Sequence, residues 1–194
     1  MTRAAIVAAR DEGNALRGIK WSKLKKQLEQ RICDPLKGRV EFFLTNYRTR
    51  LGHEAETRFW ITVDGEEVFS ASRLRWLIEY GSLANQIREI NKCTDFRSPE
   101  QREGYYRAYD DAEKILRKRG LIDDYEFGKS LKKYLSLPFD EALKSNNPVF
   151  KALAIIDGRL GKRRLQELSI QKNEHQLILR LYKLRCEVEG IDLQ

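Results

Sequence analysis

The segment RFWITVDGEEVFSAS, residues 58–72, contains the strongest fold signal in the chain, because Asp64-Gly65 separates two runs rich in β-branched and aromatic residues. An Asp-Gly pair in this setting is typical of a tight hairpin, since both positions tolerate the positive φ angles of such a turn. The segment therefore predicts two antiparallel strands. Just upstream, RVEFFLTNYR at residues 39–48 has a similar composition and predicts a preceding strand. Together these segments predict a three-stranded antiparallel meander.

Helical patterns flank the predicted sheet on both sides. Residues 21–33 and 73–92 show apolar residues at helical spacing, and Gly81 inside the second segment is a candidate kink. The rest of the chain has the pattern of successive helices. Their predicted boundaries are starts at Ser98-Pro99, Leu137-Pro138, Asn147-Pro148 and Asn173, a cap at Asp123 or Asp124, ends at Gly120 and Gly190, and a break near Gly158 or Gly161. The sequence thus predicts an α+β fold: an N-terminal helix plus a three-stranded antiparallel meander, followed by a mostly helical C-terminal half.

The expected organisation is a single domain with an extension in front of it. With 41% hydrophobic residues and only four prolines among 194 residues, the chain has the composition of a protein that buries a core. We expect residues 20–194 to form one α+β domain, with a helix and sheet sub-region at 20–92 and a helical sub-region at 93–194. Residues 1–19 are expected to be an N-terminal extension, which could be a flexible arm.

The apolar runs and the cysteines indicate a cytoplasmic location. No apolar run approaches the length of a membrane span, and charged residues interrupt the N-terminal segment where a secretion signal would be apolar. We therefore expect no membrane partner. Cys33, Cys93 and Cys186 are odd in number and far apart, which excludes a disulfide framework or a CxxC metal pair and favours a reducing compartment. Cys186 lies among apolar helical positions and is expected to be buried.

Familiar catalytic, metal and nucleotide motifs are missing from the sequence. His53 and His175 are the only histidines, and they lack the spacing of a zinc hydrolase. The segment 158–162, GRLGK, lacks the spacing of a phosphate-binding loop. The carboxylates Glu41, Asp64, Glu66 and Glu67 lie on or beside the predicted sheet, where a magnesium enzyme could use them, although Asp64 is explained as a turn residue. We therefore expect no catalytic residues, no metal and no cofactor, and an enzyme remains a less favoured alternative.

Positive charge gives the more informative pattern, because the net charge of +8 is unevenly distributed along the chain. Clusters of this kind suit phosphate groups, whereas the alternative is a solvated helix end or surface. Two sets of basic residues are candidate nucleic-acid contacts. The first is Arg159, Lys162, Arg163 and Arg164; the second is Lys23 and Lys26 on the first helix with Arg48, Arg50 and Arg58 around the strands.

Aromatic residues are interleaved with the second basic set. Phe43, Tyr47 and Trp60 could stack on bases if they are exposed, and the alternative is that they belong to the core. The order helix, three strands, helix also matches a double-stranded RNA-binding domain. That match is one of topology alone, because Arg73 and Arg75 stand where a lysine cluster is expected at the second helix.

Four segments of the chain resemble a family of bacterial proteins of unknown function. They are WSKLKKQLEQRICDPLKGRVEF, the Tyr47-Arg48 pair, WITVDGEEV, and ALAIIDGRLGKRRLQEL. The similarity runs from about Trp21 to Gly190 and leaves residues 1–19 outside it. The resemblance implies a bacterial cytoplasmic protein, and it brings no activity and no catalytic residues.

Three functions follow from these observations, and they differ in kind. The first is a non-enzymatic nucleic-acid-associated protein that contacts the phosphates of RNA or DNA through its basic patches. The second is a protein-interaction or regulatory module whose helical half docks on a partner or on itself. The third is an enzyme with carboxylate chemistry. A surface map of charge and concavity distinguishes the three.

Overall fold

The centre of the fold is a three-stranded antiparallel sheet in the computed structural model, which describes residues 20–48 and 55–192. Strands β1 (Val40–Arg48), β2 (Ala55–Val63) and β3 (Glu66–Ser72) lie in the order β1-β2-β3. Asp64 and Gly65 have φ angles of 52° and 84°, so the tight turn predicted from this pair is confirmed. The Arg39 guanidinium donates to both Asp64 carboxylate oxygens, at 2.8 and 2.6 Å, and fixes the turn against the start of β1.

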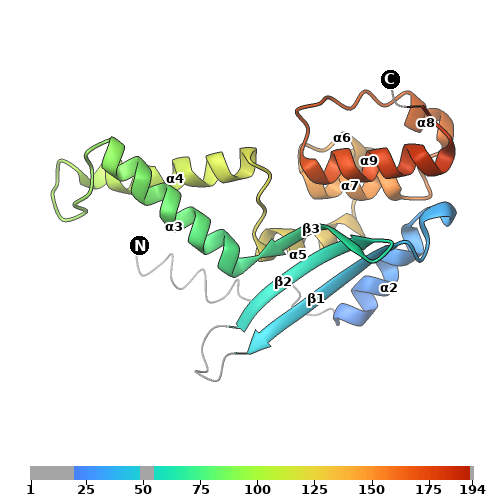
Figure 1. The fold of residues 1–194 in the computed structure, drawn as a ribbon, viewed down its shortest axis with the longest axis horizontal. Coiled ribbons are helices and arrows are strands. Elements are labelled where there is room, and N and C mark those ends of the chain that lie inside the picture. The colour runs from blue at the N-terminus through green and yellow to red at the C-terminus, as the bar shows by residue number, and fades with distance from the viewer. Residues whose placement is uncertain (1–19, 49–54, 193–194) are drawn as a thin grey trace.

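The two faces of the sheet have different surroundings. Phe42, Phe59 and Ile61 point to one face and are almost fully buried against helices α2 (Trp21–Arg31) and α5 (Asp124–Tyr134). The Phe59 ring lies 5.7 Å, centroid to centroid, from both Trp21 of α2 and Phe127 of α5. Figure 1 shows α2 and α5 behind the sheet and no described helix in front of its strands. Because side chains alternate along a strand, Phe43 and Trp60 point to this uncovered face.

The C-terminal half is helical and completes the main core. It contains α6 (Phe139–Lys144), α7 (Pro148–Ile156), α8 (Lys162–Gln166) and α9 (Gln176–Glu189), and a short 3-10 turn at Asp34–Leu36 follows α2. The N-terminal and C-terminal segments join through backbone hydrogen bonds: the Cys33 N–H donates to the Ile156 carbonyl at 2.9 Å, and the Gly158 N–H donates to the Arg31 carbonyl at 2.8 Å. The predicted break near Gly158 is thereby confirmed, since α7 ends where this pairing begins.

A helical hairpin projects from this body. Its helices α3 (Arg73–Ile90) and α4 (Arg102–Lys118) pack through a small separate cluster that includes Ala84, Ala112 and Leu116. Figure 1 shows the hairpin extending away from the sheet on the side opposite α9. Helix α3 continues without interruption through Gly81, so that residue does not end the helix.

Three predicted helix boundaries are wrong by a few residues. Helix α4 begins at Arg102 instead of Pro99, because the Gln101 side chain accepts from the backbone N–H of Asp95 and holds this segment as a turn. Helix α9 begins at Gln176, capped by the His175 side chain, and not at Asn173. The first helix ends at Arg31 because Ile32 pairs with Asp157.

Several further expectations for the fold can be compared with the described residues. The α+β class, the meander and the helical second half are confirmed. Cys186 is fully buried, as predicted. No helix in residues 20–48 and 55–192 combines the length and apolar character needed to cross a membrane. The predicted extension at residues 1–19 lies outside the described part of the chain.

Candidate functional site

The uncovered face of the sheet carries a short row of aromatic and cationic side chains, which we name the aromatic row: Lys25, Phe43, Trp60 and Arg58. Phe43 and Trp60 are directly opposite in the β1-β2 register, and their rings stack with centroids 5.2 Å apart and planes 9° apart. The Lys25 ammonium lies 4.6 Å from the centre of the Phe43 ring, and the Arg58 guanidinium lies 5.1 Å from the centre of the Trp60 ring. Both rings are half-buried, so they are neither core residues nor fully exposed.

Each cation of the aromatic row also has an acidic neighbour. Lys25 lies 3.5 Å from Glu29, and Arg58 lies 2.5 Å from Glu67. The row therefore offers flat aromatic surface and little net charge. Positive charge that could contact an anion has to be supplied by residues around the row.

Two predicted residues on α2 carry such charge, and one of them, Lys26, lies beside β1. Lys23 and Lys26 are exposed on α2, and neither forms an ion pair with any residue in the described ranges. Lys26 shares a hollow with Glu41 at the start of β1. Of the other predicted residues, Arg48 is the last residue of this strand, and Arg50 lies outside the described residues.

The C-terminal basic set is largely neutralised by acidic partners. Arg163 pairs with Glu167 at 3.1 Å, and Arg164 pairs with Asp140 at 2.5 Å. Lys162 donates to the backbone carbonyl of Glu189 at the end of α9. Phosphate contacts through these residues remain a prediction, and any such contact would compete with an existing partner.

Arg159 is held more firmly than the rest of its set. Its guanidinium donates to both Asp157 oxygens at 2.9 and 2.7 Å, while the Tyr134 hydroxyl donates to Asp157 at 2.6 Å. Burial alone would raise the pKa of Asp157, but the hydrogen bonds from Arg159 and Tyr134 leave that pKa below its ordinary value. Arg159 therefore stabilises the turn between α7 and α8.

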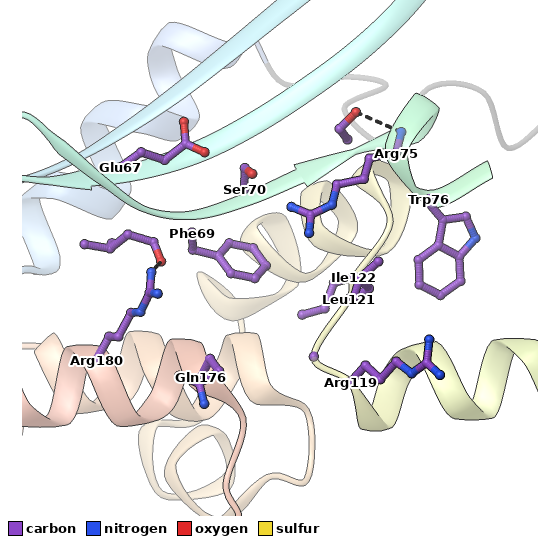
Figure 2. Close-up of a pocket in the computed structure, with 13 residues that line it drawn as sticks. Glu67, Phe69, Ser70, Arg75, Trp76, Arg119, Leu121, Ile122, Gln176 and Arg180 are labelled. Carbon is purple, nitrogen blue, oxygen red and sulfur yellow. Dashed lines mark hydrogen bonds between the residues drawn. The ribbon is translucent and has the colours of Figure 1, made fainter. Parts of the chain in front are cut away.

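A cleft of about 280 Å³ lies beyond the free edge of β3, and we name it the arginine cleft after Arg75, Arg119 and Arg180 in its lining. Figure 2 shows Arg75 and Arg180 reaching toward the space around Phe69 from opposite sides, with Arg119 on the Trp76 side. Three helices contribute one arginine each: α3, the end of α4, and α9.

These three arginines lack carboxylate partners in the part of the chain that the structure describes. Neither Arg75 nor Arg119 has a side-chain partner there, and Arg180 donates to the neutral carbonyl of Val68. The only carboxylate in the lining belongs to Glu67, which already pairs with Arg58. The arginine cleft is therefore a concentration of uncompensated positive charge.

The arginine cleft was not among the sites predicted from sequence. Its arginines come from three segments far apart along the chain, and although Arg119 ends the short basic run 117–119, nothing local in the sequence indicates that the three lie together. A partial signal was present: Arg75 falls in the first turn of the helix that follows the predicted hairpin, close to a helix N-terminus.

The carboxylates considered for metal chemistry do not come together. Asp64 is bound by Arg39 in the hairpin turn, and Glu67 by Arg58. In the described residues no group of three or more His, Cys, Asp or Glu side chains is arranged to hold a metal ion.

Comparison with known proteins identifies the family. No curated protein and no solved structure matches the chain. The model of one protein family matches residues 20–186, from the residue before α2 to the last turns of α9. This range includes the aromatic row and the arginine cleft, and it agrees with the similarity expected from Trp21 onward. The chain belongs to the SF0329 protein family.

Proposed function

We propose that this protein binds single-stranded nucleic acid, RNA or DNA, on the uncovered face of its sheet. The observation that carries the proposal is the stacked pair Phe43 and Trp60, which lies on the face opposite the core. Apolar aromatic surface on such a face does not contribute to the main core of the fold. Bases stack on aromatic side chains with little regard to sequence, because every base has a π face.

The charges around the aromatic row support this proposal. Cations without an ion pair in the described residues lie on both sides of it: Lys26 on α2 beside β1, and the arginine cleft beyond β3. Neighbouring strands lie about 4.8 Å apart, so a short strand of nucleic acid that crosses the sheet reaches both groups. Its bases meet the aromatic row while its phosphates meet the cations on either side.

Binding to oligonucleotides of mixed sequence tests the proposal. We expect single-stranded RNA or DNA of about twelve nucleotides to bind at low salt, with an affinity that falls as salt rises. The Trp60→Leu variant removes one stacking surface and should weaken binding by about 1 to 3 kcal/mol. Fluorescence anisotropy of a labelled oligonucleotide measures both effects, and a duplex of the same sequence is expected to bind more weakly.

A matched control separates stacking from a general loss of structure. Tyr106 is an aromatic residue of α4 that is 41% exposed and far from the aromatic row, so Tyr106→Leu should bind like the unmodified protein. Circular dichroism melts verify that each variant folds. If Trp60→Leu and Phe43→Leu bind single strands as tightly as the unmodified protein does, the proposal is wrong.

The protein-interaction alternative has separate support in the α3-α4 hairpin. Leu77 and Ile78 of α3 are 50% and 61% exposed, although neighbouring large apolar side chains are usually buried. Self-association through this face would cover them. Light scattering over a range of protein concentrations tests this: a monomer at all concentrations argues against it, and a dimer that Ile78→Asp dissociates supports it.

A further inference from the structure

The arginine cleft has the chemistry of an anion site, and its parts come from separate elements. Arg75, Arg119 and Arg180 line a space of about 280 Å³ beside the free edge of β3, with Arg75 and Arg180 on either side of Phe69 and Arg119 toward Trp76 (Figure 2). Guanidinium groups donate in a planar fork that matches the oxygens of a phosphate. The three arginines lack carboxylate partners in the described residues, and like charges repel. An anion bound in the cleft would therefore be stabilised by their positive charge.

Two helix N-termini add to the same field. Helix α3, of 18 residues, begins beside the cleft with Ser72 as its N-cap, and helix α9, of 14 residues, begins there at Gln176. The free N–H groups of a helix N-terminus carry partial positive charge and favour anions. One carbonyl that would oppose them, that of Gly120, already accepts a hydrogen bond from His175 at 2.9 Å.

The position of the cleft indicates which phosphate it receives. Phe43, Trp60 and Ser70 are paired across the three strands on the uncovered face, and Ser70 also lines the cleft. A line drawn across the sheet from the aromatic row through Ser70 thus ends at the cleft. Gly120, Leu121 and Ile122, in the link between α4 and α5, form its wall on the other side (Figure 2). A strand that crosses the sheet toward the cleft meets this wall, so the cleft would receive the end of such a strand.

A strand end differs from the rest of the strand in charge. A terminal phosphate is a monoester, whose second pKa near 6 gives it about −1.5 to −2 charges at pH 7, whereas each internal phosphodiester carries one. The arginine cleft, whose arginines lack carboxylate partners in the described residues, therefore binds a terminal phosphate more favourably than an internal one. We propose that the arginine cleft binds a phosphate monoester, supplied by the end of the strand that lies on the sheet. This inference rests on the proposed function for its source of phosphate, but not for its chemistry.

The test compares oligonucleotides that differ only at their ends. Labelled strands of about twelve nucleotides carry a 5′-phosphate, a 3′-phosphate or only hydroxyls, and their affinities are measured at one salt concentration. We expect one of the phosphorylated strands to bind about tenfold more tightly than the unphosphorylated strand, as charge-assisted hydrogen bonds to a dianion allow. Free nucleoside monophosphate, measured by calorimetry, is the second arm and reports on the cleft without a strand.

Variants assign the effect to the cleft. The double variant R75Q/R119Q should abolish the preference for the phosphorylated end and change the affinity for the unphosphorylated strand less. The fold should tolerate it, because neither side chain has a partner among the described residues. The variant R75K/R119K keeps the charges but loses the planar fork, so we expect it to lose most of the preference. The control R97Q/R107Q removes two exposed arginines outside the cleft and should keep the preference intact.

The outcomes distinguish this inference from the proposed function. If single strands bind equally with and without terminal phosphates, and nucleoside monophosphate does not bind, the inference is overturned while the proposed function stands. If nucleoside monophosphate binds and R75Q/R119Q abolishes that binding, but no strand binds, the cleft is a phosphate site and the proposed function is wrong. A preference that survives R75Q/R119Q also overturns the inference.

Discussion

The imidazole of His175 is hydrogen-bonded to the backbone carbonyl of Gly120, with 2.9 Å between Nε2 and the oxygen. Its other nitrogen, Nδ1, accepts from the backbone N–H of Leu177 at 3.1 Å and caps helix α9. Accepting at Nδ1 while donating at Nε2 requires the neutral ring with its proton on Nε2. One neutral histidine thus ties the end of α4 to the start of α9, at the border of the arginine cleft.

This arrangement predicts an acid-sensitive stability. Burial lowers the pKa of His175 below its ordinary value of 6.5, and the hydrogen bond to Gly120 offsets part of that shift. In the unfolded chain the ring takes up its proton near pH 6.5, before the folded form does. The stabilisation is therefore complete above pH 6.5 and is lost as the pH falls from 6.5 through the lower pKa of the folded state. Chemical unfolding at about pH 7.5 and about pH 5 measures the loss.

The small number of histidines makes the control simple. The chain has two, His175 and His53, so replacing each in turn separates the contribution of His175 from that of the 29 acidic residues, which begin to take up protons near pH 5. His175→Gln should be less stable at neutral pH, because the cap of α9 is lost, but should lose less further stability on acidification. His53→Gln should keep the acid response of the unmodified protein. An unchanged response in His175→Gln would contradict this prediction.

Two glycine substitutions should change stability in opposite directions. Gly81 lies inside α3, and a Cβ there meets open space, so Gly81→Ala should stabilise the protein by about 0.5 to 1 kcal/mol. Gly120 has a φ of +82°, and a Cβ there would lie 3.3 Å from the His175 Nε2. Gly120→Ala should therefore destabilise by about 1 to 2 kcal/mol. Thermal melts of both variants check the prediction, which equal shifts in the same direction would refute.

Two aspartates that pair with arginine should differ in their contribution to stability. Asp157 is 2% exposed and accepts from Arg159 and the Tyr134 hydroxyl, so Asp157→Asn should cost about 3 kcal/mol. Asp140 pairs with Arg164 at the surface, where solvent screens the pair, and Asp140→Asn should show no measurable loss. Urea unfolding of the two variants provides the comparison. Similar stabilities for both would mean that the Asp157 network does not stabilise the fold.

Much of the fold was predictable because its signals are local. The Asp64-Gly65 turn and the Asn147 cap depend on residues close in sequence, and both appear as expected. The start of α9 was not predictable in this way. Its cap is a histidine whose orientation depends on Gly120, a residue that the sequence places far away.

The candidate site was less predictable because charge pairing is a tertiary property. The sequence shows four cations between Arg159 and Arg164, but the partners of two of them lie on other helices: Asp140 for Arg164 and the Glu189 carbonyl for Lys162. Conversely, Arg75, Arg119 and Arg180 lie in three segments far apart in the sequence, and only the packing of three helices beside β3 brings them to one cleft. Phe43 and Trp60 were candidates for base stacking, but the alternation within β1 and β2 does not give the register that sets the two rings opposite each other. The alternation pattern also did not indicate which face of the sheet the helices would leave uncovered.

The last prediction compares charge reversal on α2 with charge reversal on α8. Both basic sets were candidate phosphate contacts in the sequence, but only the second is paired with acidic residues in the structure. Lys23 and Lys26 have no partner among the described residues, so K23E/K26E should weaken nucleic-acid binding and reduce the dependence of its affinity on salt by about one phosphate contact per lysine. Arg163 and Arg164 already pair with Glu167 and Asp140, so R163E/R164E should have a much smaller effect, although it changes the net charge equally. Affinities across a salt series measure both slopes. Because net charge is matched, equal losses in the two variants would show that overall charge, rather than the surface around the aromatic row, attracts the strand.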